Sequence, residues 1–101
     1  MLVERMIPKP GEGPDEEERE NGFFNLILLG EFEDGTVIRA RVKGDRDPGY
    51  GSTCKMLSES AVCLATDRLD VGGGLWTPAS AMGRILRDRL VRNAGLSFEI
   101  E

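Results

Sequence analysis

The sequence contains no histidine, and this absence limits the chemistry that the chain could carry out. Histidine is the most common general base and metal ligand, and it completes the usual serine and cysteine nucleophile pairs. We therefore expect no metal site and no catalytic triad, and we assign no catalytic residue within the chain.

Long hydrophobic runs are also missing. The longest apolar run, residues 26–29, has the length of a core strand and falls far short of the roughly 18 residues that a membrane helix needs. The two cysteines, Cys54 and Cys63, lie on opposite faces of one predicted helix and cannot bridge each other. With no signal-peptide pattern, these features predict a reduced, cytoplasmic chain without membrane insertion.

A concentration of basic residues is the third missing feature. The net charge is -5, and residues 1–22 alone carry seven acids and three bases. Residues 23–101 carry eleven acids and ten bases, so the predicted folded part is close to neutral. Nucleic-acid binding requires a basic patch or stripe, so we expect no nucleic-acid partner.

The chain of 101 residues has the length of one domain. Residues 1–22 are rich in proline, glycine and acids, and we expect an acidic linker there. Two descriptions of residues 15–21 remain open: a disordered acidic tail, or a single helical turn capped by Asp15 and stopped at Gly22. Residues 23–101 form the predicted domain.

Residues 23–32 and 36–43 alternate in the manner of two strands, and Glu33-Asp34-Gly35 between them indicates a hairpin. A two-residue loop would set Leu28 opposite Arg41, whereas a three-residue loop with a left-handed Gly35 sets it opposite Ala40. We expect the three-residue loop, because it keeps one face of the hairpin apolar. The other face carries three large apolar residues that need a cover, which another subunit or another domain could supply; a homodimer through this face is one such arrangement. These residues are Phe23, Ile27 and Leu29.

Two helices and a last strand follow the hairpin. The first helix should run over residues 52–67 and bury a stripe of mostly small residues: Cys54, Leu57, Ala61, Leu64 and Ala65. The second should begin after an N-cap at Thr77, with Pro78 in its first position, and end near residue 93 before Gly95. It should bury Ala79, Met82, Ile85, Leu86 and Leu90.

Residues 96–100 alternate again and predict an edge strand. This order of elements predicts an α+β domain, with a mainly antiparallel sheet and two helices packed on one face.

A tight bend at residues 47–51, Asp47-Pro48-Gly49-Tyr50-Gly51, precedes the first long helix, which should open at Ser52 or Thr53. The unpaired N–H groups and the dipole of a helix start attract a carboxylate or phosphate, so the bend could bind an anion. In the alternative interpretation, Ser52 or Thr53 caps the helix and no ligand is involved. A second glycine-rich stretch, residues 71–76, lacks both the G-x-G-x-x-G pattern and a surrounding βαβ unit, so it does not predict a dinucleotide site.

Four blocks of sequence resemble the C-terminal part of the saccharopine dehydrogenase-like oxidoreductases, and in particular their bacterial branch of trans-acting enoyl reductases. The blocks are PGEGPxEExRExG at 10–22, GDxDPGYGxTxKMLxESAxCLAxD at 44–67, GGGxWTPAxAMGxxLxxRL at 72–90 and AGLxFE at 94–99. In that family an N-terminal Rossmann domain binds NAD(P), while the C-terminal α+β domain helps to form the substrate cleft and the dimer interface.

The resemblance implies that this chain is a substrate-binding and assembly domain that lacks its Rossmann domain and is not catalytic alone. It also implies a substrate-side role for residues of the bend and, more weakly, for the start of the second helix. The implied residues are Asp47, Gly49, Tyr50, Gly51, Ser52, Thr53 and Thr77. NAD(P) would bind to the missing domain. Two alternatives are a stand-alone module for a small anion or nucleotide and a structural dimerisation domain.

Overall fold

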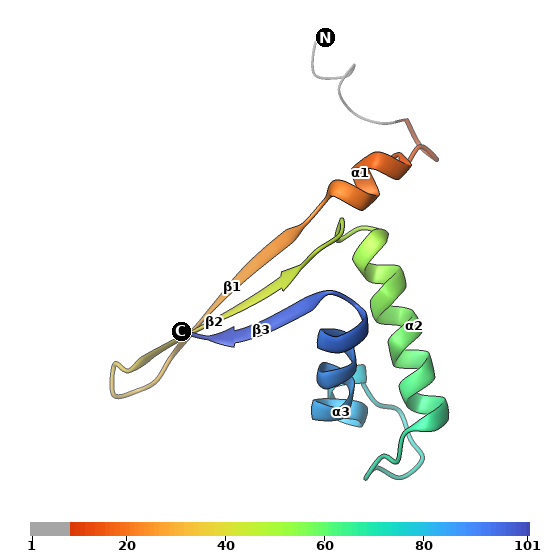
Figure 1. Ribbon diagram of the computed structural model, residues 1–101. Coiled ribbons are helices and arrows are strands. Elements are labelled where there is room, and N and C mark those ends of the chain that lie inside the picture. Colours follow the sequence, from red (N-terminus) through yellow and green to blue (C-terminus); the bar gives the residue numbers. More distant parts are fainter. Residues whose placement is uncertain (1–8) are drawn as a thin grey trace.

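The computed structural model describes residues 9–101 and has the α+β architecture that the sequence predicts (Figure 1). The first eight residues of the expected linker lie outside the described residues. In chain order the elements are α1 (Glu16–Asn21), β1 (Phe24–Glu31), β2 (Val37–Gly44), α2 (Gly51–Thr66), α3 (Pro78–Asn93) and β3 (Leu96–Ile100).

Strands β1 and β2 form the predicted hairpin in the predicted register. Leu28 lies opposite Ala40, and Gly35 has a φ of 81°, in the left-handed region that favours glycine. The Asp34 carboxylate accepts a hydrogen bond from the Thr36 backbone at 2.9 Å and stabilises the turn. The three-residue loop is therefore confirmed, and with it the apolar face on one side of the hairpin.

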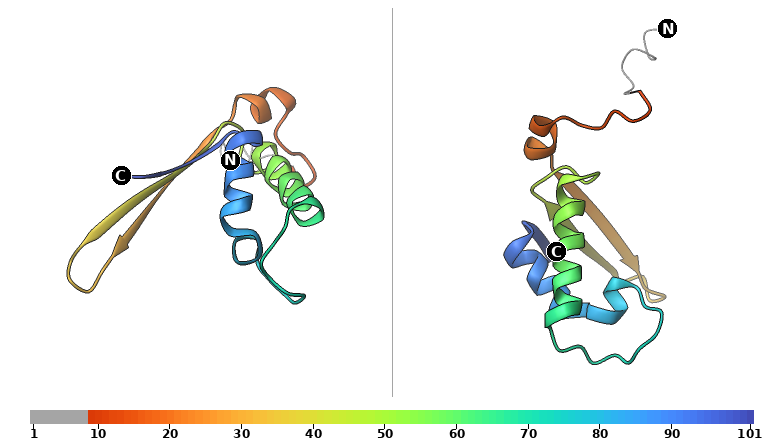
Figure 2. Two further views of the ribbon diagram at one scale, coloured as in Figure 1. Left: turned by 60° about the horizontal axis from the view of Figure 1, so that its bottom comes forward. Right: turned by 90° about the vertical axis from the view of Figure 1, so that its right-hand side faces the viewer.

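The sheet has three antiparallel strands in the order β1-β2-β3, so β3 is an edge strand as predicted. Helix α2 packs against α3, and α3 contacts β3, but the hairpin extends away from both helices as an arm (Figures 1 and 2). Leu96 is buried near the helices, whereas Leu26 on the same sheet face is 57% exposed. The helices thus cover only one end of the face that they were expected to cover.

The core lies between α3, α2 and β3. Its buried members are Cys63, Met82, Leu86, Leu90, Ala94 and Leu96. Three of the residues predicted for the buried face of α3, namely Met82, Leu86 and Leu90, belong to it. Ala79 and Ile85 are exposed instead. Gly83 (φ 44°, ψ -124°) interrupts the helix between Met82 and Leu86, both of which remain buried.

The predicted buried stripe of α2 is wrong. Cys54, Leu57, Ala61, Leu64 and Ala65 are all exposed, and the helix buries Ser52 and Cys63 in their place. Polar contacts fix this rotation of the helix: the Ser52 hydroxyl donates to the backbone carbonyl of Arg46 at 3.0 Å. Hydrogen bonds inside the molecule therefore outweigh a weak hydrophobic stripe in setting which face points inward.

Helix α1 follows an Asp15 cap, in which Asp15 and Glu18 each bond the other's backbone N–H. Two contacts attach it to the segment after β2. The Asp47 backbone N–H donates to the Arg19 carbonyl at 3.3 Å, and the Arg46 guanidinium donates to the Glu20 carbonyl at 3.0 Å. The acidic segment before the hairpin therefore lies against the bend that precedes α2.

Candidate functional site

The bend before α2 is organised by the Asp47 carboxylate. One of its oxygens accepts the backbone N–H of Gly49 at 2.9 Å. The other accepts the N–H groups of Tyr50 and Gly51, at 2.9 and 2.8 Å. Gly51 is the first residue of α2, so the carboxylate lies at the positive end of the helix dipole.

The two hydroxyl groups at the start of α2 are also engaged within the bend. Ser52 is buried and donates to the Arg46 carbonyl, while the Thr53 hydroxyl donates to the Pro48 carbonyl at 2.7 Å. Neither side chain caps the helix, and Tyr50 at the N-cap position makes no side-chain cap. The interpretation in which Ser52 or Thr53 caps the helix is therefore wrong, and the Asp47 carboxylate accepts N–H groups at the helix start instead.

These contacts weaken the hypothesis that the amides of the bend bind an incoming anion. The backbone N–H groups of Gly51, Tyr50 and Gly49, with the nearby Arg19 charge, hold the pKa of Asp47 below its ordinary value. Asp47 is consequently a carboxylate at neutral pH, and it would repel a second anion at the same amides. A stand-alone anion-binding module loses its main support.

A groove of about 630 Å³ lies beside the bend, between α1 and the start of α2. Its lining brings together charged, aromatic and thiol side chains, among them Arg19, Glu20, Arg46, Tyr50, Cys54 and Lys55. The Tyr50 side chain is largely exposed, and Lys55 pairs with Asp45 at 3.4 Å. The sequence pointed to Tyr50 and Gly51, but it did not predict that α1 would contribute the opposite wall.

Thr77 lies away from this groove and is used locally. Its hydroxyl accepts the Ser80 backbone N–H at 3.3 Å, and the Ser80 hydroxyl accepts the Thr77 N–H at 3.1 Å. This capping box starts α3 at Pro78, as the sequence predicts. Thr77 borders a different, mostly apolar groove together with Trp76 and Met82, so the structure does not bring it together with the residues of the bend.

The glycine-rich stretch between α2 and α3 does not have the form of a dinucleotide site. No strand precedes it, and the helix that follows is capped by Thr77. The Trp76 indole N–H donates to the Gly72 carbonyl at 3.0 Å and closes the loop on itself. The residues of this chain therefore do not fit the phosphates of a nicotinamide dinucleotide at this loop.

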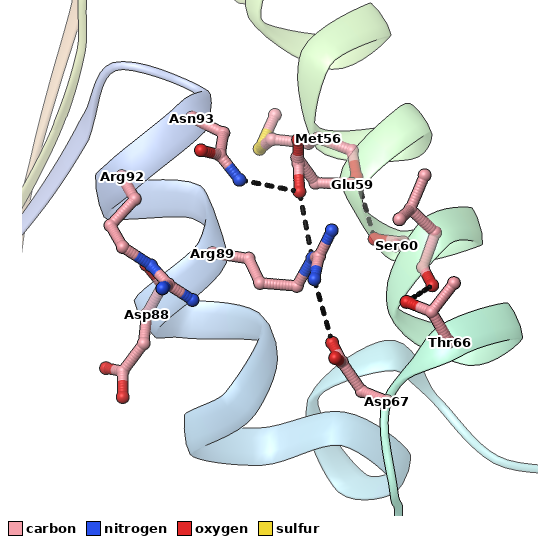
Figure 3. A network of polar contacts seen from close by, with 10 residues as sticks. Met56, Glu59, Ser60, Thr66, Asp67, Asp88, Arg89, Arg92 and Asn93 are labelled. Carbon is pink, nitrogen blue, oxygen red and sulfur yellow. Dashed lines mark hydrogen bonds and ion pairs between the residues drawn. The ribbon is translucent and has the colours of Figure 1, made fainter.

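The contact between α2 and α3 contains a polar network that the sequence did not reveal (Figure 3). The Arg89 guanidinium donates to Glu59 at 2.9 Å and to Asp67 at 3.0 Å, and Asn93 donates to Glu59 at 3.1 Å. No pattern in the sequence marks Arg89 as the centre of this network. Its two acidic partners lie 22 and 30 residues away, too far for a helical spacing rule to find them.

Two further properties concern only residues 9–101. No group of three or more cysteine, aspartate or glutamate side chains is placed to hold a metal ion in this part of the chain. No helix there is both long enough and apolar enough to cross a bilayer.

Comparison with known proteins gives matches over almost the whole chain. A Mycobacterium tuberculosis H37Rv protein named as a trans-acting enoyl reductase is 41% identical over 100 residues, which is 97% of this chain. The trans-acting enoyl reductase of Mycobacterium bovis BCG Pasteur is 40% identical over 91 residues, or 88% of the chain. That of Mycobacterium ulcerans is 39% identical over 90 residues, or 87% of the chain.

The chain is similar to trans-acting enoyl reductases. It spans only 24%, 22% and 21% of the lengths of these three relatives, so most of each reductase has no counterpart here. No family model and no solved structure matches the chain. The matched segments cover 87–97% of this chain, and therefore most of its described residues.

Proposed function

We propose that this chain is the C-terminal substrate-binding and assembly domain of an NAD(P)-dependent oxidoreductase of the saccharopine dehydrogenase-like group. In this proposal it is not catalytic alone. The observation that carries the proposal is the coverage of the comparison, since 97% of the chain aligns with 24% of a protein named as an enoyl reductase. The rest of such a protein is large enough to contain a Rossmann domain.

The groove between α1 and α2 is the surface that we assign to the substrate side. Tyr50 lines the groove with a largely exposed side chain, and Arg46 and Lys55 add positive charge beside the acidic Glu16 and Glu20. Asp47, Gly49, Gly51 and Ser52 act in this proposal by holding the bend, because their polar groups are already paired. Tyr50 is then the residue of the bend that is best placed to contact a ligand. Thr53 does not line this groove and instead borders a separate apolar groove together with Met56 and Leu57.

The nicotinamide cofactor would bind to the part of the protein that this chain lacks. When bound, it supplies a hydride for the reduction of a carbon–carbon double bond. The present chain would contribute a wall of the substrate cleft and exclude water from it. Thr77 remains a weaker candidate for this wall, since it lies at the start of α3 beside the apolar groove that includes Trp76.

A comparison of three proteins tests this proposal: the chain alone, the Mycobacterium tuberculosis relative, and a chimera in which this chain replaces the matching segment of that relative. Oxidation of NADPH with an enoyl thioester is measured for each. We expect turnover by the relative and by the chimera and none by the chain alone. Saturable turnover by the chain alone would overturn the proposal, as would a folded chimera without activity beside an active relative.

The Tyr50→Phe variant of the chimera tests the assigned groove. Loss of one hydroxyl hydrogen bond to the substrate should raise KM by about three- to tenfold while the unfolding midpoint stays unchanged. Thr66→Ala at the other end of α2 is the control, since Thr66 is exposed and its hydroxyl donates only to the Val62 carbonyl, and the KM of this variant should not change. An unchanged KM for Tyr50→Phe would remove the groove from the substrate cleft.

A structural dimerisation domain is the second candidate. The observation in its favour is the exposure of the side chains expected to form the interface, with Phe23 76% and Leu29 70% exposed and Ile27 half exposed. Multi-angle light scattering of the chain over a wide concentration range tests it, and a monomer at every concentration would exclude it.

A further inference from the structure

Strand β1 has one backbone edge without a partner strand among residues 9–101. The sheet order places β1 at one side, with only β2 beside it. The Phe32 backbone N–H donates to the Thr36 carbonyl, which fixes the alternation of hydrogen bonds along the pair. Leu26 and Leu28 therefore direct their backbone groups to β2, while Asn25, Ile27 and Leu29 direct theirs out of the sheet.

The side chains of β1 are apolar on both faces, unlike those of a typical edge strand. Leu26 and Leu28 project from one face, Ile27 and Leu29 from the other, and all four are at least half exposed. No charged residue occurs between residues 23 and 30. Natural edge strands are usually short, charged or bulged, whereas an apolar run on both faces is typical of a strand inside a covered sheet.

The opposite edge of the sheet provides the contrast. Strand β3 has only five residues, and acidic side chains within it and directly after it pair with basic residues of β2. Glu99 lies 3.5 Å from Lys43, and Glu101 lies 2.7 Å from Arg41. This edge carries the charge that discourages pairing with another strand, and the β1 edge does not.

We propose that β1 is an interior strand of a larger sheet, and that a strand from the remaining part of the longer polypeptide pairs with its free edge. This inference rests on the proposed function, because it requires the rest of an oxidoreductase around this chain. About three quarters of the length of each relative lies outside the match, which is enough chain to supply the strand and to cover both faces of the arm.

The distribution of charge favours this partner over a second copy. In antiparallel pairing of β1 with itself, the hairpin turn of one copy would lie beside α1 of the other. Both segments are acidic, since the turn carries Glu31, Glu33 and Asp34, and α1 carries Glu16, Glu17, Glu18 and Glu20. Like charges in such proximity oppose self-pairing, and a strand of different sequence avoids the repulsion.

Amide hydrogen exchange in the chain alone and in the chimera described above tests the inference. In the chain alone, the amides of Ile27 and Leu29 should exchange freely while those of Leu26 and Leu28 are protected. In the chimera, the amides of Ile27 and Leu29 should exchange at least about tenfold more slowly. Equal rates for these two amides in both proteins would overturn the inference, and so would protection in the chain alone that increases with its concentration.

Two proline variants distinguish the free edge of β1 from the edge that is hydrogen-bonded to β2. Ile27→Pro removes an N–H that points out of the sheet, so the chain alone should keep its urea midpoint, whereas the chimera should lose the protection of Leu29. Leu28→Pro removes a hydrogen bond to β2 and should lower the midpoint of the chain alone. A folded Ile27→Pro chimera with full protection of Leu29 would contradict the proposed pairing. Activity of the chimera is a separate readout, so protected amides in an inactive chimera would refute the proposed function alone.

Discussion

The Asp47 carboxylate lies 2.8 Å from the backbone nitrogen of Gly51, the first residue of α2. Asp47 also donates its own N–H to the Arg19 carbonyl of α1, so this residue connects α1 with the start of α2. One aspartate thus positions the bend, the groove beside it and the helix that follows.

Replacement of Asp47 by asparagine should lower the urea midpoint of unfolding at neutral pH. The change removes the negative charge at the positive end of α2 and leaves three N–H groups with a weaker acceptor. Asp45→Asn is the matched control, since Asp45 is exposed and its pair with Lys55 is long, at 3.4 Å. An equal effect of both variants would show that the cap does not stabilise α2.

The same contact predicts a dependence of stability on pH. The folded state lowers the pKa of Asp47 from its ordinary 3.8, so the stabilisation is present above that value. It is lost as the pH falls through the lowered pKa and the carboxylate becomes protonated in the folded protein. The difference in midpoint between wild type and Asp47→Asn should therefore be largest near neutral pH and shrink under strongly acidic conditions. A difference that persists after protonation would point to another cause.

Leu86→Ala should destabilise the protein by about 2–5 kcal/mol, because Leu86 is buried in the core and its loss leaves a cavity. Ile85, the preceding residue on the same helix, is the matched control. Since Ile85 is exposed, Ile85→Ala should cost less than about 1 kcal/mol. Urea unfolding of the two variants compares them directly, and an equal or larger loss for Ile85→Ala would contradict the orientation of α3 in the core.

Gly44→Ala should destabilise the sheet by about 1–3 kcal/mol, since the added methyl group would overlap the ring of Phe24 on the adjacent strand. Gly30 lies further along the same hairpin and is the control. A methyl group there would meet its nearest neighbour, the Ile38 carbonyl oxygen, at 3.9 Å, so Gly30→Ala should change stability by less than about 0.5 kcal/mol. Thermal or urea unfolding distinguishes the two, and similar stabilities would contradict the packing of Phe24 on Gly44.

The two cysteines should differ strongly in reactivity. Cys54 is exposed, whereas Cys63 is buried, and burial followed by the neighbouring Asp67 raises the pKa of the Cys63 thiol. Iodoacetamide at mildly alkaline pH should therefore label Cys54 in the folded chain and leave Cys63 unmodified until urea is added. Mass spectrometry of the digested protein measures both sites, and labelling of Cys63 in the folded chain would contradict its place in the core.

Local rules were sufficient for those elements whose signals lie within a few residues of one another. Gly35 and the alternation on both sides of it predicted the hairpin register, because a slip of one residue would have placed Arg41 on the apolar face. Thr77 and Pro78 predicted the start of α3 for a similar reason, since a cap and a first-turn proline act on adjacent backbone groups.

Features set by contacts between distant residues could not be predicted in this way. The rotation of α2 depends on Ser52 meeting Arg46 and on Glu59 meeting Arg89, whereas its small side chains gave only a weak preference for one face. The wall that α1 contributes to the groove depends on Arg46 reaching the Glu20 carbonyl. The contacts of Asp47 could have been predicted from the sequence, because an aspartate before a proline and a glycine commonly accepts the backbone N–H group two residues further along the chain.

The projecting arm also has a consequence for handling the protein. When the chain is produced by itself, residues 26–29 expose four neighbouring apolar side chains with no charge among them, and such a segment promotes aggregation before folding is complete. We therefore expect recombinant production of residues 1–101 to yield inclusion bodies at high expression levels. A lysine at position 27 or 29 should move the product into the soluble fraction of the lysate.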